Sequence, residues 1–236
     1  HFRYGNTMFV MLNTEDMSKK GEFEAAAEWL RNCVNLARGS ENPPTFVVVC
    51  MHYEWFIGTS GRSSEYTRWH RVFDELGIDL AVAGNNHVYL RTPALFDGQV
   101  TDGSYGTVYL QTTASDNDRG RAFADTPLQN ADKIAFRWTE GSHTVSAIHL
   151  DVNPQRIALK LMDRSGNGID STVIPAKPRT EAQDSHLVHG PWVTDMSEDA
   201  FTVLWSTDVP CQGWVQLDNG RRVYEDYAGR KLFGTL

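Results

Sequence analysis

The chain has 236 residues, 41% hydrophobic and 22% charged, a composition typical of a globular protein. Its formal net charge of −8 argues against general affinity for nucleic acid, because no basic excess is available to neutralise phosphates. No apolar run approaches the roughly 20 residues of a membrane span, and three scattered cysteines are too few for a disulfide framework or a zinc knuckle.

The first part of the chain alternates predicted strands with predicted helices. The apolar run 8–12 predicts a buried strand, and apolar residues at helical spacing predict a helix over 21–37. The continuous apolar run 45–51 predicts a strand buried on both faces. A second helical stripe at 66–76 is followed by a short buried strand at 78–83. This order is typical of α/β layering with parallel strands.

The pattern changes after Pro93. Short β segments separated by turns predict an antiparallel meander that extends to residue 175. Residues 176–185 are polar and contain proline, which suits a linker. Residues 186–236 contain sandwich-like strands but, at about 50 residues, supply roughly half of such a fold. The expected organisation is an α/β domain over 1–175, a linker, and a partial β-sandwich.

Two histidines directly follow predicted parallel strands, where α/β folds place their functional residues. His52 follows the strand 45–51, and His87 follows the strand 78–83 across the turn Gly84-Asn85-Asn86. Neutral imidazole is a common metal ligand. Each histidine alone also fits a satisfied polar residue at a strand end, but their equivalent positions favour a metal site.

Residues 79–92, DLAVAGNNHVYLRT, resemble the last motif of calcineurin-like metallophosphoesterases, especially of the purple acid phosphatase branch. In that branch, Gly-His-x-His is followed by an aromatic residue, a charged residue and Arg. Residues 48–52, VVCMH, resemble the preceding motif, in which a strand delivers one histidine ligand. Residues 144–170 resemble the closing hairpins, and 190–192 with 201–208 resemble the branch's fibronectin-like domain. The resemblance implies the C-terminal portion of a layered α/β/β/α metallophosphoesterase sandwich, followed by a partial fibronectin-like β-sandwich.

The resemblance also implies a dinuclear centre of two divalent or trivalent metal ions, Zn, Mn or Fe. His87 matches a ligand of the first metal and His52 a ligand of the second. Asn85 stands in place of the motif's first histidine, normally also a ligand of the second metal, and an amide oxygen is a weaker ligand for zinc or iron. Three outcomes stay open: a weakened second site, a preference for a harder ion such as manganese or magnesium, or a purely positioning role for Asn85.

Three further residues are candidates for substrate binding. Tyr53 and Glu54 lie in the loop after His52, where the resemblance places substrate-facing groups. Glu54 fits a solvated loop equally well, and Arg91 fits either a phosphate contact or a surface ion pair. His70 falls on the polar side of the second predicted helix, and we expect it to face solvent.

The family's remaining ligands have no counterpart, since no segment reads Gly-Asp-x-x-Tyr or Gly-Asn-His-Glu. The expected function is metal-dependent hydrolysis of small phosphoesters, by a dinuclear site to which this chain gives about half of the ligands. An N-terminal portion or a partner chain would supply the rest, and the catalytic residues stay unknown. The alternatives are a non-catalytic member of the fold that acts as a binding module, and an unrelated α/β binding module. The resemblance favours a secreted or periplasmic location.

Overall fold

The computed structural model describes residues 1–14, 22–53, 63–114, 119–122, 130–177, 186–207, 214–218 and 222–224. The chain divides into two compact units, His1–Lys177 and Pro178–Leu236. Of the predicted linker, only residues 176 and 177 belong to the described residues.

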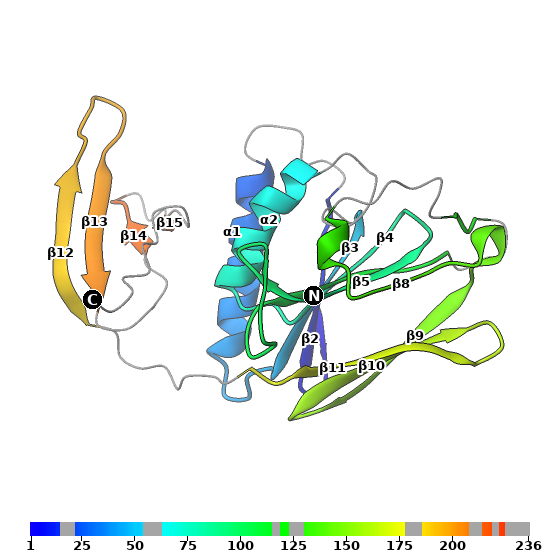
Figure 1. Ribbon diagram of the computed structural model, residues 1–236. Helices are drawn as coiled ribbons and strands as arrows, with labels where there is room; N and C mark the ends of the chain where they lie inside the picture. Colours follow the sequence, from blue (N-terminus) through cyan, green and yellow to red (C-terminus); the bar gives the residue numbers. More distant parts are fainter. Residues whose placement is uncertain are drawn as a thin grey trace. The chain divides into compact units, whose positions relative to one another are not determined.

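The first unit combines two α-helices with two β-sheets in its described residues (Figure 1). Its elements are β1 (Phe2–Tyr4), β2 (Thr7–Met11), α1 (Glu22–Arg38), β3 (Phe46–Tyr53), α2 (Ser63–Glu75), β4 (Leu80–Gly84), β5 (Tyr89–Phe96), β6 (Gln99–Val100), β7 (Thr107–Gln111), η2 (Ala131–Lys133), β8 (Phe136–Trp138), η3 (Gly141–His143), β9 (Ser146–Asn153), β10 (Arg156–Asp163) and β11 (Gly168–Pro175).

The large sheet has eight strands in the order β1-β2-β3-β4-β7-β5-β6, with β8 also paired to β5. Strands β2, β3, β4 and β7 run parallel. The outer strands β1, β5, β6 and β8 pair antiparallel. The mixed sheet confirms the predicted α/β class. It also brings the carboxyl ends of β3 and β4 to the same edge.

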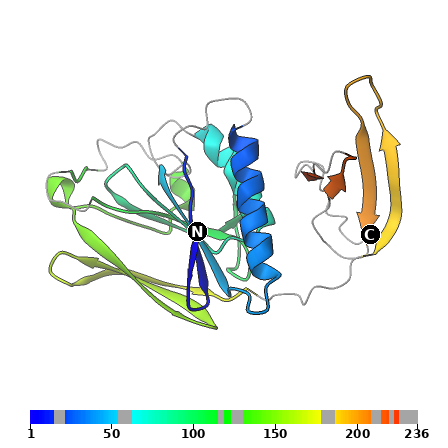
Figure 2. The same ribbon diagram turned by 180° about the vertical axis from the view of Figure 1, so that it is seen from behind.

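Both helices lie on one face of the large sheet, as the front and back views show (Figures 1 and 2). The apolar stripe of α1 is buried there: Ala27, Leu30 and Val34 pack in one core with Val47 and Val49 of β3. The helix forms here because its apolar residues recur every three to four positions, so one side can leave water completely. This confirms the helix expected over 21–37.

The second sheet, with strand order β11-β10-β9, packs on the opposite face. Phe46 and Val48 of β3 point into this second core, against Ile157, Leu159 and Leu161 of β10. Successive β3 side chains therefore enter different cores, which explains why the run 45–51 is apolar throughout. Each such side chain contributes about 1.5–3 kcal/mol by leaving water.

The described residues of this unit thus form three layers: helices, large sheet, small sheet. The second helical layer of the expected α/β/β/α arrangement is not among them. The N-terminus also differs in detail, because β1 and β2 form a hairpin. Gly5, with φ of 56°, makes its turn.

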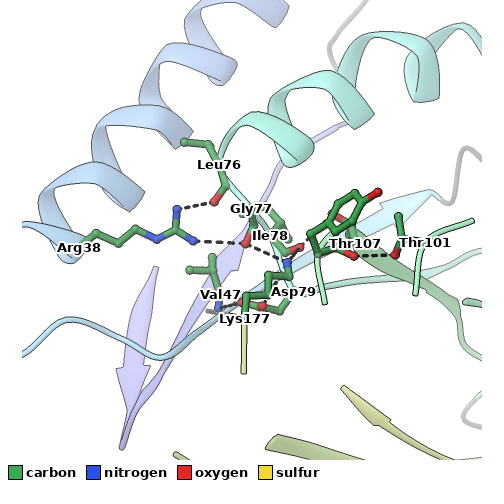
Figure 3. A network of polar contacts seen from close by, with 10 residues as sticks. Arg38, Val47, Leu76, Gly77, Ile78, Asp79, Thr101, Thr107 and Lys177 are labelled. Atoms are coloured by element: carbon green, nitrogen blue, oxygen red, sulfur yellow. Dashed lines mark hydrogen bonds and ion pairs between the residues drawn. The ribbon is translucent and has the colours of Figure 1, made fainter. Parts of the chain in front are cut away.

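A network of polar contacts lies at the amino end of β4, opposite the edge of the large sheet where β3 and β4 end (Figure 3). Lys177 Nζ donates to the carbonyls of Ile78 at 2.6 Å and Gly77 at 3.1 Å, and lies 3.2 Å from Asp79 Oδ1. Asp79 Oδ2 accepts the Val47 N–H at 2.8 Å. Arg38 adds a second cation on the Gly77 carbonyl. The network fixes the last residue of the first unit to the start of a central strand.

The described part of the second unit forms two antiparallel pairs of strands. The first is β12 (Leu187–Thr194) with β13 (Thr202–Thr207), and the second is β14 (Trp214–Gln216) with β15 (Arg222–Tyr224). The fibronectin-like sandwich expected here stays a prediction. Across the described residues of both units, no helix is long and apolar enough to cross a membrane.

Candidate metal centre

The candidate ligands lie at the carboxyl edge of the parallel strands, where β3 and β4 end together. Tyr53 pairs in register with Gly84, the last residue of β4. A Cβ placed on Gly84 would lie 3.6 Å from the His52 carbonyl oxygen, so the two backbones are in contact at this point. His52 and the turn that carries Asn85 and His87 therefore leave the sheet from neighbouring strands.

The turn between β4 and β5 holds two non-glycine residues in the left-handed region. Asn85 has φ of 75° and His87 has φ of 59°. Asn and His adopt this region more readily than most side chains, but it costs energy and is concentrated at functional sites. The turn reverses the chain from the parallel strand β4 into β5, which pairs antiparallel with β7.

The imidazole of His87 is oriented by a backbone carbonyl. Its Nδ1 lies 2.5 Å from the carbonyl oxygen of Arg119. Because a carbonyl only accepts, this contact selects the tautomer of a neutral ring that carries its proton on Nδ1 and a lone pair on Nε2. Metal-binding histidines are commonly fixed in this way through their other ring nitrogen.

His52 and Asn85 offer donors of different strength. His52 is exposed, and its ring meets the Tyr53 ring edge-on with centroids 4.7 Å apart. The Asn85 amide nitrogen lies 3.5 Å from Asn86 Oδ1. The oxygen of an amide is a ligand type that hard cations accept. Glu54, the other candidate in this loop, lies outside the described residues.

Arg91 faces away from solvent and is engaged with Asp170 of β11. Its Nε lies 2.7 Å from Asp170 Oδ2 and its Nη2 lies 3.0 Å from Oδ1. The Tyr89 hydroxyl donates to the same carboxylate at 2.9 Å, and burial together with the Asp170 charge raises the pKa of Tyr89. Arg91 is 9% exposed, so its ion pair is not on the surface. The guanidinium therefore joins the two sheets, and the phosphate contact expected of Arg91 stays a prediction.

The expectation that His70 faces solvent was wrong. The residue is 7% exposed, and its Nε2 lies 3.8 Å from Asp97 Oδ1 in the turn between β5 and β6. One helical turn later, Asp74 Oδ2 accepts the Asp97 N–H at 2.8 Å. Desolvation raises the pKa of Asp74 to about 7. This polar side of α2 is covered by a hairpin distant in sequence, which helical periodicity could not reveal.

The candidate side chains are of the types that bind metal ions, but they are too few to hold a dinuclear centre. Two imidazoles and one amide are suitable ligands, yet a stable site needs at least about three or four protein groups per ion. Within the described ranges, no group of three or more His, Cys, Asp or Glu residues could hold a metal ion. A centre at this edge would therefore need ligands beyond those that the described residues bring together.

Comparison with known proteins gives a match in structure alone. No family model matches the sequence, and neither does any curated protein. The chain resembles the purple acid phosphatase PPD1 from seeds of yellow lupin (Lupinus luteus), with a TM-score of 0.56 and 17% identity over 78% of this chain and 35% of that chain. It also resembles GAP50, the anchor in the inner membrane complex of Plasmodium, with a TM-score of 0.52 and 13% identity over 73% of this chain and 50% of that one. A weaker likeness, to PhoD, has a TM-score of 0.45 and 18% identity over 74% and 44% of the two chains.

The helix layer, the mixed sheet and the small antiparallel sheet define a layered α/β fold. It is a fold of the metallophosphoesterase type, as found in the purple acid phosphatase. The chain spans 35% of PPD1 and 50% of GAP50.

Proposed function

We propose that this chain forms part of a metal-dependent phosphoester hydrolase and gives about half of the ligands of its dinuclear site. The observation that carries the proposal is the pair of neighbouring strand ends: β3 delivers His52, and β4 leads into the turn that holds Asn85 and His87. The Arg119 carbonyl leaves His87 Nε2 as the atom for a metal. The phosphatase-type fold supports this assignment.

In this proposal His87 holds one metal ion, and His52 with the Asn85 amide oxygen holds the other. The ions, Zn, Mn or Fe, would supply a bound water acidic enough to be hydroxide near neutral pH. The other ligands, and the proton donor for the leaving group, would come from polypeptide that these 236 residues do not include. The substrate would be a small phosphorylated molecule, with Tyr53 and Glu54 as candidate contacts, and the location secreted or periplasmic.

Calorimetric titration of residues 1–236 with Zn²⁺ and with Mn²⁺ tests the ligands. We expect weak binding that falls at least about tenfold in His87→Ala and in His52→Ala, since each removes one of few donors. Asn85→His should tighten binding of Zn²⁺. The matched control is His149→Ala, an exposed histidine on β9. Equal binding by all four variants and the unchanged chain would overturn the assignment.

Hydrolysis of an aryl phosphate tests the reaction. Residues 1–236 alone should be nearly inactive. The protein purified from its natural source should hydrolyse the aryl phosphate, and the same full protein carrying His87→Ala should not. Full metal-dependent turnover by the 236-residue chain would show that the ligands are misplaced.

Asn85 favours a second candidate, a non-catalytic binding module built on the same fold. Replacing imidazole by an amide weakens affinity for zinc or iron, and one structure of similar fold, GAP50, is an anchor. Metal binding without hydrolysis in the natural protein would favour this function over the first.

A further inference from the structure

The orientation of His87 depends on a short segment that is distant from it in sequence. The Arg119 carbonyl oxygen lies 2.5 Å from His87 Nδ1. The place of this carbonyl therefore influences which ring nitrogen carries the proton. A carbonyl can act in this way only if its own backbone is held in place. The contacts of residues 119–122 thus bear directly on the candidate metal centre.

Gly120, the next residue, packs directly against the turn between β8 and β9. A Cβ placed on Gly120 would overlap the Gly141 carbonyl oxygen, and it would lie 2.8 Å from the Thr144 nitrogen and 2.9 Å from the Thr144 Cβ. Two of these neighbours are backbone atoms, which cannot rotate away as the end of a flexible side chain can. Any residue larger than glycine would therefore force the segment and the turn apart.

Two threonines hold the turn itself. Thr144 is fully buried, and its hydroxyl donates to the Gly141 carbonyl at 2.7 Å and accepts the Glu140 N–H at 2.6 Å. The Thr139 hydroxyl accepts the Gly141 N–H at 3.1 Å and donates to the Arg121 carbonyl. The turn thus holds the segment both by close packing and by a hydrogen bond.

The same turn is joined to the chain that follows β7, beside the strand that leads to His87. Ala114 forms a parallel bridge with Val145. Two residues before Ala114, the Thr112 N–H donates to the Ala83 carbonyl of β4 at 2.8 Å. The turn between β8 and β9 is therefore tied, through a few backbone contacts, to the strand end from which the His87 turn departs.

We propose that Gly120 and Thr144 are positioning residues for His87. Together they hold the Arg119 carbonyl against Nδ1, so that the neutral ring keeps its proton on Nδ1 and its lone pair on Nε2. Neither residue is a metal ligand, and both act through the backbone of Arg119. The use of the Nε2 lone pair by a metal ion rests on the function proposed above.

Nitrogen-15 NMR of histidine-labelled residues 1–236 tests the proposal without metal. At about pH 8.5 the imidazoles are neutral, and their ring nitrogen shifts identify the tautomer. The His87 signal is the one that is missing in His87→Ala. We expect its Nδ1–H form to exceed its Nε2–H form at least about fivefold, the effect of one hydrogen bond. A ring protonated mainly on Nε2 in the unchanged chain would overturn the proposal.

Two pairs of variants separate positioning from folding, which circular dichroism monitors. Thr144→Val removes the buried hydroxyl and Thr144→Ser keeps it, so the first should lose the Nδ1–H preference and the second should retain it. Gly120→Ala should also lose the preference. Its control, Gly39→Ala, should retain it, because a Cβ on Gly39 meets its nearest neighbouring atom at 3.4 Å, an ordinary contact. An unchanged tautomer ratio in Gly120→Ala and Thr144→Val, or equal losses in the two Thr144 variants, would overturn the proposal.

Calorimetric titration with Zn²⁺ gives a second readout. Gly120→Ala and Thr144→Val should each weaken binding at least about tenfold relative to Gly39→Ala and Thr144→Ser, as loss of a partner behind a metal ligand does. The two measurements fail separately. The wrong tautomer in the absence of metal counts against the positioning residues, whereas zinc binding that is insensitive to His87→Ala counts against the proposed function.

Discussion

Arg91 on β5 and Asp170 on β11 form a two-point ion pair that crosses the second core. The Nε–Oδ2 distance is 2.7 Å and the Nη2–Oδ1 distance is 3.0 Å, and the two side chains are 11% and 6% exposed. The pair joins the large sheet to the small one, with Tyr89 as a third member. Buried pairs of this kind specify an arrangement more than they add net stability, because both charges lose their hydration.

We expect Arg91→Met to lower the free energy of unfolding by about 3–5 kcal/mol, because it leaves the Asp170 carboxylate buried without its cation. The double variant Arg91→Met/Asp170→Leu should recover most of that loss. Tyr89→Phe should cost about 1 kcal/mol, the contribution of one hydrogen bond. Urea denaturation followed by circular dichroism measures all three. Additive losses in the double variant would contradict the coupling.

The half-buried ammonium of Lys177 is the basis of a second prediction. Lys177→Ala should lower the free energy of unfolding by about 3–5 kcal/mol, since Asp79, 3% exposed, would lose its cationic partner. Lys160→Ala, at an exposed position of β10, is the control and should stay within about 0.5 kcal/mol of the unchanged chain. Thermal unfolding compares them, and similar losses for both lysines would contradict the role given to the network.

Asp74 should make stability fall as pH rises. Its pKa is about 7 in the folded chain because of burial, compared with 3.8 for an ordinary aspartate. The unfolded state therefore releases this proton near pH 4 and the folded state near pH 7. The contribution is fully present below about pH 4 and is lost by about pH 7, by as much as about 4 kcal/mol.

Asp74→Asn should remove this decline, because an amide oxygen can still accept the Asp97 N–H without a charge. Denaturant unfolding between pH 4 and pH 8 measures the slope. The control is Asp132→Asn, an exposed aspartate, which should leave the slope unchanged. An equally steep decline in Asp74→Asn would show that another group is responsible.

Limited proteolysis tests the two-unit organisation. The structural division falls between Lys177 and Pro178, and the sequence predicts a linker over 176–185. Trypsin should cut first after Arg179, because proline blocks the bond after Lys177. A fragment ending at Arg179 should persist, as judged by its intact mass. Earlier cleavage after Arg156 or Lys160, which both belong to β10, would contradict a stable first unit.

The sequence by itself was enough to predict the helices and strands that depend on local patterns of apolar residues. The α1 stripe and the apolar run of β3 are read from periodicity, because a helix must bury one side and a central strand must bury both. The same periodicity predicted His52 and His87 just past two strands. The structure places His52 inside β3, next to its last residue, and the order of elements brings the ends of β3 and β4 to one edge of a parallel sheet.

The partners of the buried polar side chains could be identified only from the tertiary structure. Arg91 and Asp170 are 79 residues apart, and neither residue type indicates a partner at that distance. His70 lies on the polar side of α2, but it is buried, and the turn between β5 and β6 contacts it through Asp97. Local sequence fixes which side of an element is apolar. The pairing of distant elements fixes which charges lose water, and those charges then depend on partners that only the folded chain brings to them.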